Sequence, residues 1–295
     1  MRHFIWICLV SFSLQATAAP TSNFYATPPS VEKALAISES LIGKPYQAFL
    51  LGEGPLDPIT PRSLFRLDAF DCLTYVETVI ALTYADSDAS FEQHYKALKY
   101  HGTPQDFFHR NHFTHVQWNR YNQAQGYLQP YLPPHTQMPT ETLHTPIDIP
   151  RWYTHLSTDP AAWRRLSGQA LTPTTVARLQ KAAAQSSPTI SNLTYFPISA
   201  LLSADGTMPH AIRSMLPQIS VVEIVRKNWD TASRIGTALD ISHIGLLLHQ
   251  GDRVILRHAS EIHQRVLDEP LENYLQQQRQ QASFAGLYIQ TLNLH

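Results

Sequence analysis

The sequence predicts an α+β fold in which helices come first and a mainly antiparallel sheet is completed near the end of the chain. Two observations predict it. Apolar residues recur at helical spacing over 31–43 and 72–84, and a glycine at position 43 suits a helix end. Short runs rich in β-branched and apolar residues, which are typical of strands, occupy 219–225, 241–249, 253–259 and 284–292.

The first nineteen residues predict a secretory signal peptide. A short basic start leads into an apolar run from Phe4 to Leu14, and small residues follow it. This run is too short to span a bilayer, and Cys8 lacks the small preceding residue of a lipoprotein signal. We therefore expect an exported protein, periplasmic or secreted, with no stable membrane anchor.

Residues 20–295 are predicted to form a single domain. Its core is expected from 31–85 and 218–295, and the intervening segment 86–217 is interpreted as a large irregular insertion that holds helices near 91–100 and 174–184. The formal net charge is −1 and only 15% of residues are charged, which argues against nucleic acid or an anionic membrane as partner. We expect a monomer.

Cys72 is the cysteine that remains after removal of the signal peptide, since the chain has only two. An exported protein rarely keeps a single free thiol unless the thiol is buried or reactive. Asp71 is a good N-cap residue, so Cys72 is expected in the first turn of its helix. The helix dipole favours an anion there, which predicts a lowered pKa and a nucleophilic thiolate.

Two histidines are expected to share one face of a hairpin near the end of the chain. If Gly251-Asp252 is the turn, Gly245 falls opposite His258, and His243 lies on the same face as both. His243 and His258 are then diagonal neighbours, and the glycine leaves His258 room to lean toward His243. A nucleophilic cysteine needs a base of this kind.

These residues resemble a known superfamily. The stretches "GKPY", "FDCLTYVE", "SHIGLLL" and "VILRHAS" are similar to the NlpC-type, papain-like cysteine peptidases that cut bacterial cell-wall peptides. The longer pattern "RLDAFDCLTYVETVIAL" with "RNHF" resembles a branch long catalogued as a domain of unknown function, some of whose members are N-acetylmuramoyl-L-alanine amidases. Two features depart from the superfamily: Leu73-Thr74 replaces Ser-Gly after the cysteine, and no Gly-Asp precedes the histidine strand.

The resemblance implies a papain-like core, with catalytic roles for Cys72, His243 and His258. Cys72 would attack an amide carbonyl, His243 would hold and then donate the proton, and His258 would fix the tautomer of His243. The backbone N–H of Cys72 and the Tyr46 hydroxyl would hold the oxyanion, with Asp71 beside them. No metal or cofactor is needed.

The same resemblance implies the substrate. It predicts hydrolysis of the bond between N-acetylmuramic acid and L-alanine, with a preference for small anhydro-muramoyl peptides over intact wall. A muropeptide or peptidoglycan fragment is therefore the expected partner. Arg110, His112 and Trp118 are the candidate substrate contacts.

Three alternatives stay open at this point. Relatives in the superfamily more often cut between D-glutamate and diaminopimelate. "HRNHFTH" spaces His109, His112 and His115 three apart, which would suit a zinc amidase, although no H-E-x-x-H is present. A non-catalytic binder of wall fragments could use Trp152 and Tyr153 for sugar stacking, but it would not need a helix-start thiol near two strand histidines.

Overall fold

The computed structural model describes residues 22–131, 133 and 138–294, so the predicted signal peptide lies outside the described residues. The predicted α+β class is confirmed. An eight-stranded sheet runs in the order β2-β3-β8-β4-β5-β6-β7, β1 pairs with β8, and every pairing is antiparallel. In the described part of the chain, no helix is long and apolar enough to cross a membrane.

The strands are β1 (Leu128–Pro130), β2 (Glu141–Ile147), β3 (Thr189–Pro197), β4 (Ile219–Arg226), β5 (Ile241–Gln250), β6 (Arg253–Ser260), β7 (Arg265–Pro270) and β8 (Phe284–Leu292). The helices are α1 (Ser22–Tyr25), α2 (Val31–Ser40), α3 (Cys72–Tyr84), α4 (Asp88–Lys99), α5 (Arg120–Ala124), α6 (Ile149–Thr158), α7 (Pro160–Ser167), α8 (Pro173–Gln185), α9 (Ile198–Leu201), α10 (His210–Arg213), α11 (Ala232–Ile235) and α12 (Leu271–Gln278). A 3₁₀ turn, Phe107–His109, and a π-helix, Thr114–Asn119, complete the set.

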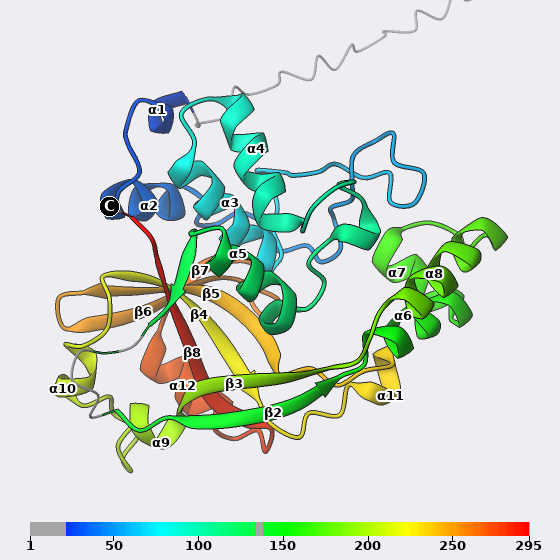
Figure 1. The fold of residues 1–295 in the computed structure, drawn as a ribbon. Coiled ribbons are helices and arrows are strands. Elements are labelled where there is room, and N and C mark those ends of the chain that lie inside the picture. Colours follow the sequence, from blue (N-terminus) through cyan, green and yellow to red (C-terminus); the bar gives the residue numbers. More distant parts are fainter. Residues whose placement is uncertain (1–21, 132, 134–137, 295) are drawn as a thin grey trace, which may run out of the picture.

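Helices lie on both sides of the central strands. Helices α2, α3 and α4 cover one face, while α9, α10 and α12 lie toward the other (Figure 1). The core beneath α3 joins its Val76, Val79 and Ile80 to Ile244 and Leu246 of β5. Leu247 of β5 packs instead with the core around α12, as alternation along a strand requires.

Helix α3 begins at Cys72, as predicted, because Asp71 caps it. The Thr74 amide donates to Asp71 Oδ1 at 2.8 Å, and the Asp71 amide donates to Thr74 Oγ1 at 2.9 Å. This reciprocal capping box satisfies two backbone N–H groups and fixes where the first turn starts. It also places Cys72 over the sheet, since α3 packs on β5 and β6.

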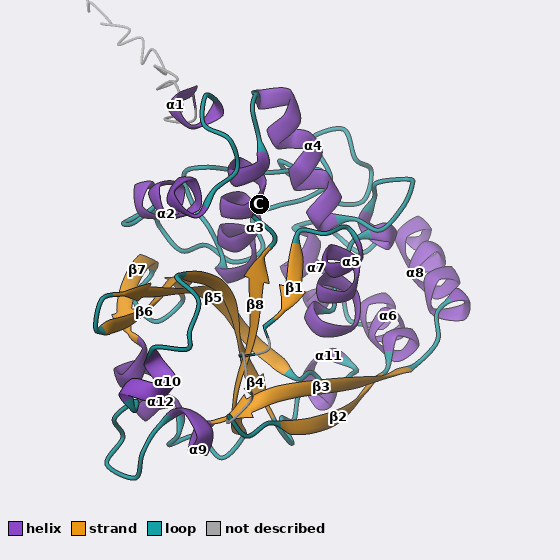
Figure 2. Ribbon diagram, turned by 60° about the vertical axis from the view of Figure 1, so that its left-hand side comes forward, coloured by secondary structure: helices purple, strands orange, loops and turns teal. Residues whose placement is uncertain are grey.

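The prediction that 86–217 is an irregular insertion is wrong. This segment contributes β1, β2 and β3 to the sheet, and α4 packs against α3. Helices α6, α7 and α8 form a lobe at the end of the long β2–β3 hairpin (Figure 2). Prolines stand in the first turns of these helices, after the N-caps Asp148, Asp159 and Thr172, where no backbone N–H is needed. The helix predicted near 174–184 is α8.

Candidate active site

Cys72 meets β5 at the residue that follows His243. Hydrogen bonding from the backbone N–H of Ile244 acts to lower the pKa of Cys72, so the thiol lies near this part of β5. Cys72 is a free cysteine, and the residue is partly exposed. His243 is also partly exposed. The start of α3 therefore lies beside the segment of β5 that carries His243.

The predicted hairpin register is confirmed. Gln250 pairs with Arg253 and Leu246 with Arg257, so Gly245 falls opposite His258. A Cβ at Gly245 would stand 3.0 Å from the Cβ of His258, tighter than normal contacts allow. The missing side chain lets the two imidazoles meet: His243 Nε2 lies 2.6 Å from His258 Nδ1.

Glu269 of β7 continues this chain and was missed by the sequence interpretation. Its Oε2 lies 2.7 Å from His258 Nε2, and its Oε1 lies 3.5 Å from Nε2 of the exposed His263. Hydrogen bonding to His258 is the main cause that lowers the pKa of Glu269, so the carboxylate is ionised. Residues 265–270 form a strand that pairs with the strand of His258. The alternation of side chains along this strand was the signal that could have identified Glu269.

The hydrogen bonds assign the tautomers. An ionised Glu269 can only accept, so His258 donates through Nε2–H and accepts at Nδ1. His243 then donates to His258 through Nε2–H, which leaves Nδ1 of His243 as its free basic nitrogen. This assignment follows from the network of donors and acceptors.

Tyr274 of α12 packs over both imidazoles and was not anticipated either. Its ring centroid lies 6.4 Å from that of His243 and 5.7 Å from that of His258. Burial is the main cause that raises the pKa of Tyr274, and the electrostatic influence of Cys72 adds to it. Tyr274 thus packs against both histidines and lies near Cys72.

The expectation of a lowered pKa at Cys72 is wrong for the unliganded site. Burial and the Asp71 carboxylate raise the pKa of Cys72 to about 12, outweighing the backbone N–H groups of Ile244, Leu73 and Cys72 itself. Burial, followed by His258 and Arg226, lowers the pKa of His243 to about 3. Both changes favour the neutral pair, with the proton on sulfur.

This charge state predicts how Cys72 reacts with iodoacetamide. Because the thiolate is the reactive form, alkylation should be slow at pH 7 and should accelerate through pH 10 without a plateau in the acid range. The rate is measured by intact-protein mass spectrometry across pH 5–10. A fast reaction that stays level from pH 5 to pH 8 would instead show a thiolate–imidazolium pair already formed.

Tyr46 lies at the rim of the same site. Its amide donates to the Gln264 carbonyl at 3.0 Å, and its side chain is half-buried. Burial and then the neighbouring Cys72 raise the pKa of Tyr46, so its hydroxyl keeps its proton and can donate. Asp71, the other rim residue, uses its carboxylate to cap α3.

Two of the three candidate substrate contacts are packed against other side chains. Trp118 is 0% exposed and donates from Nε1 to Glu77 at 2.9 Å, so the prediction of a direct contact is wrong. His112 packs between Phe107 and Trp152, with ring centroids 4.5 and 4.7 Å away, and its Nε2 lies 2.7 Å from the Phe107 carbonyl. Trp118 therefore belongs to the hydrophobic core, while His112 stays partly exposed.

The remaining candidate, Arg110, is held by an internal carboxylate. Its Nε donates to Glu53 Oε1 at 2.7 Å, and its Nη2 contacts the same oxygen. Only 16% of the Arg110 side chain is exposed. It lines a small pocket next to the start of α3, together with Asp71 and Thr74.

The three histidines of "HRNHFTH" do not converge. His109 pairs with Asp106 at 2.7 Å, His112 packs as described, and His115 lies against Tyr288 with ring centroids 5.4 Å apart. Within the described ranges, no group of three or more histidine, cysteine, aspartate or glutamate side chains is arranged to hold a metal ion.

Residues 36–283 match the model of the AmiA-like family, described as N-acetylmuramoyl-L-alanine amidase-like. The chain belongs to this family. It is therefore placed among amidase-like proteins related to hydrolases of peptidoglycan amide bonds. The search of curated proteins found no match.

Solved structures share the fold. Protein LPG0564 from Legionella pneumophila is 29% identical, with 93% of each chain covered and a TM-score of 0.81. An N-acetylmuramoyl-L-alanine amidase from Bacteroides uniformis is 22% identical, with 88% of this chain and 97% of that chain covered and a TM-score of 0.60. The second likeness concerns the fold alone.

Proposed function

We propose that this protein is a papain-like cysteine amidase that hydrolyses the bond between N-acetylmuramic acid and L-alanine in peptidoglycan fragments, anhydro-muramoyl peptides in particular. The observation that carries the proposal is that the partly exposed Cys72 lies beside the segment of β5 whose His243 begins the hydrogen-bonded chain His243–His258–Glu269. Membership of the amidase-like family supplies the bond class. The location that we propose, as the predicted signal peptide implies, is the periplasm or the space outside the cell.

The chemistry is acyl transfer through a thioester. As Cys72 Sγ bonds to the lactyl carbonyl carbon, its proton passes to Nδ1 of His243, which then gives it to the leaving L-alanine nitrogen. The C–N bond breaks and leaves a muramoyl thioester. Water, deprotonated by the same His243, attacks that thioester and releases the muramic acid carboxylate, while Cys72 recovers its proton.

A neutral Cys72–His243 pair before substrate binds is consistent with this order of chemical steps. Because the thiol is protonated before substrate binds, proton transfer and attack are coupled, and His243 acts as a general base. The imidazolium that forms would donate from Nε2 to His258, which is itself oriented by the Glu269 carboxylate. The developing oxyanion would be held by the Cys72 backbone N–H and the Tyr46 hydroxyl.

Replacing Glu269 by glutamine should lower kcat/KM by roughly 10- to 100-fold, because His258 loses the anion that fixes its orientation. Glutamine keeps the size but not the charge, so the acid limb of the pH–rate profile should also change shape. Asp268→Asn, a matched change on the neighbouring residue, should leave that profile as in the wild type. An unchanged profile in Glu269→Gln would mean that the carboxylate only supports packing.

Product analysis tests the proposed bond. Wild-type enzyme and Cys72→Ala are incubated with purified anhydro-muropeptides, and products are read by mass spectrometry. The proposal requires free anhydro-N-acetylmuramic acid and an intact stem peptide, formed only by the wild type, unaffected by a chelator and stopped by a thiol alkylator. Release of a diaminopimelate-containing fragment with the sugar still attached to L-alanine would assign the endopeptidase reaction instead.

A further inference from the structure

A small pocket lies beside the first turn of α3, and the mechanism above does not use it. Its volume is about 100 Å³. The residues that line it are Phe49, Leu51, Asp71, Leu73, Thr74, Glu77, Lys99, Arg110, Asn111 and Leu166. Asp71 and Leu73 flank Cys72 in the sequence, so the pocket is lined by the residues on either side of the nucleophile.

Contacts between residues far apart in the sequence hold the two sides of the pocket together. Arg62 donates from Nη1 to the Phe49 carbonyl and, at 3.3 Å, to the Leu166 carbonyl, so it ties the loop after α2 to the end of α7. Phe49 has a φ of +58° and is 45% exposed. A bulky residue with positive φ is uncommon, and such strain concentrates at ligand sites.

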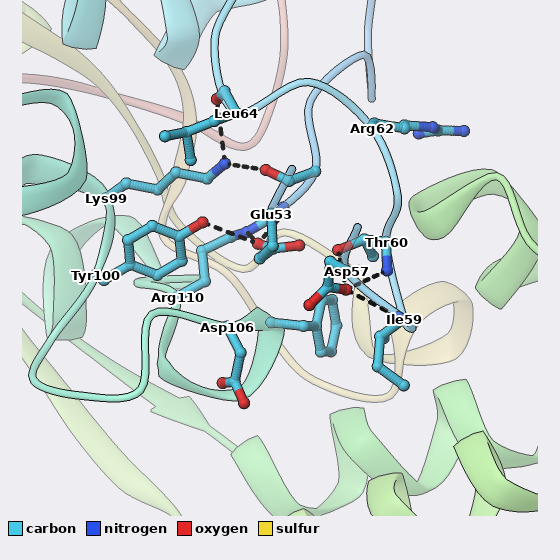
Figure 3. Close-up of polar contacts among 12 residues, drawn as sticks. Glu53, Asp57, Ile59, Thr60, Arg62, Leu64, Lys99, Tyr100, Asp106 and Arg110 are labelled. Carbon is cyan, nitrogen blue, oxygen red and sulfur yellow. Dashed lines mark hydrogen bonds and ion pairs between the residues drawn. The ribbon is translucent and has the colours of Figure 1, made fainter. Parts of the chain in front are cut away.

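The polar walls balance each other in charge. Lys99 is held by the carbonyls of Gly52 at 2.6 Å and Leu64 at 3.4 Å, and Arg110 is paired with Glu53 (Figure 3). Burial lowers the pKa of Lys99 and raises that of Glu77, so both tend toward neutrality. A neutral ligand therefore suits this pocket better than a charged one.

Hydrogen-bonding capacity is left over beside the pocket. Glu53 Oε2 is buried and has no hydrogen-bond partner, while Nε and Nη2 of Arg110 both contact the other oxygen, Oε1. The opposite walls, Leu51, Leu73 and Leu166, are apolar. The pocket is far smaller than the roughly 300 Å³ or more of pockets for whole ligands, so a small neutral group with a polar and an apolar end fits it.

We propose that this pocket binds the N-acetyl group of the muramic acid, with Phe49 packing on the sugar. The inference rests on the proposed function. Muramic acid carries its acetamido group on the ring carbon next to the one that bears the lactyl ether. When the lactyl carbonyl lies at Cys72, the acetamido group is the neighbouring substituent, and its methyl, N–H and C=O match a pocket with apolar and polar walls.

The test varies the size of the N-acyl group. N-acetylmuramoyl-L-alanyl-D-isoglutamate is compared with its N-propionyl and N-benzoyl analogues. Wild-type kcat/KM should fall at least tenfold from acetyl to benzoyl, with propionyl between them. Leu166→Ala, which enlarges the pocket, should restore cleavage of the benzoyl analogue at least tenfold while cleaving the acetyl substrate less well. Leu51→Ala provides the same enlargement if Leu166→Ala does not fold.

Leu56→Ala is the control, because it makes the same change on a side chain that is 96% exposed. It should behave as the wild type with every analogue. Equal kcat/KM for the three analogues in the wild type, or an equal change for all three in Leu166→Ala, would overturn the pocket assignment.

Binding to Cys72→Ala separates this inference from the proposed function. If no analogue is cleaved at the muramoyl–alanine bond, the proposed function is wrong. Calorimetric affinity of the Cys72→Ala protein for the three analogues still reports on the pocket: weaker binding of the benzoyl analogue, recovered by adding Leu166→Ala, supports it. Equal affinity for all three refutes it.

Discussion

Replacing Cys72 by alanine should lower turnover of an anhydro-muramoyl peptide by on the order of 10⁴-fold or more, because no other group can form the thioester. Folding should be retained. The side chain is half-buried and makes no disulfide, so its loss should change the free energy of unfolding by only about 1 kcal/mol. The measurement is kcat/KM by product release, with a thermal unfolding curve of each protein as control.

Cys72→Ser refines this test. Serine keeps the geometry but is a weaker nucleophile beside the same imidazole. The activity of Cys72→Ser should therefore be lower than that of the wild type or be lost. Substantial activity in Cys72→Ala, in a sample verified by mass to lack the wild-type chain, would rule out a cysteine mechanism.

Replacing His243 by alanine should lower kcat/KM by on the order of 10³-fold or more. The neutral Cys72 thiol then has no base in position, and the leaving amine has no acid. The matched control is His249→Ala, since His249 lies on the same strand, is half-buried and contacts the Leu216 carbonyl instead. That variant should stay within about twofold of the wild type, as expected for a residue that does not touch the reacting atoms.

The double variant Cys72→Ala/His243→Ala distinguishes a catalytic partnership from two independent defects. Residues that act as a unit show strongly non-additive losses, so the double variant should be no slower than Cys72→Ala alone. If the losses of kcat/KM in the two single variants multiply in the double variant, the two residues act independently.

Local signals predicted the elements that carry the site. Asp71 as an N-cap residue predicted the start of α3, and Gly251-Asp252 predicted the β5–β6 register that joins His243 to His258. Both depend on residues close together in the sequence, where capping and turn chemistry act directly.

Features that depend on distant residues were not predictable in the same way. Glu269 reaches His258 only because β7 pairs with β6, and Trp118 is buried because Glu77 on another helix accepts its N–H. The predicted lowering of the pKa of Cys72 was wrong for the same reason. The helix start was visible in the sequence, but the burial that outweighs it comes from the fold.

Strands β2 and β3 were missed because they carry proline, histidine and asparagine, which are weak strand formers. Their pairing over seven residues, Glu141 opposite Tyr195 through Ile147 opposite Thr189, supplies what local propensity lacks. Tertiary pairing therefore decided the structure of the middle segment.

Intact-protein mass spectrometry of an acid-quenched reaction tests the central claim most directly. Wild-type enzyme is mixed with an anhydro-muramoyl peptide, quenched during turnover, and digested to locate any adduct. We predict a thioester on Cys72 whose added mass is the anhydro-N-acetylmuramoyl group without its peptide. An adduct on Cys72 that contains stem-peptide residues, or an acyl group on any other side chain, would contradict the account.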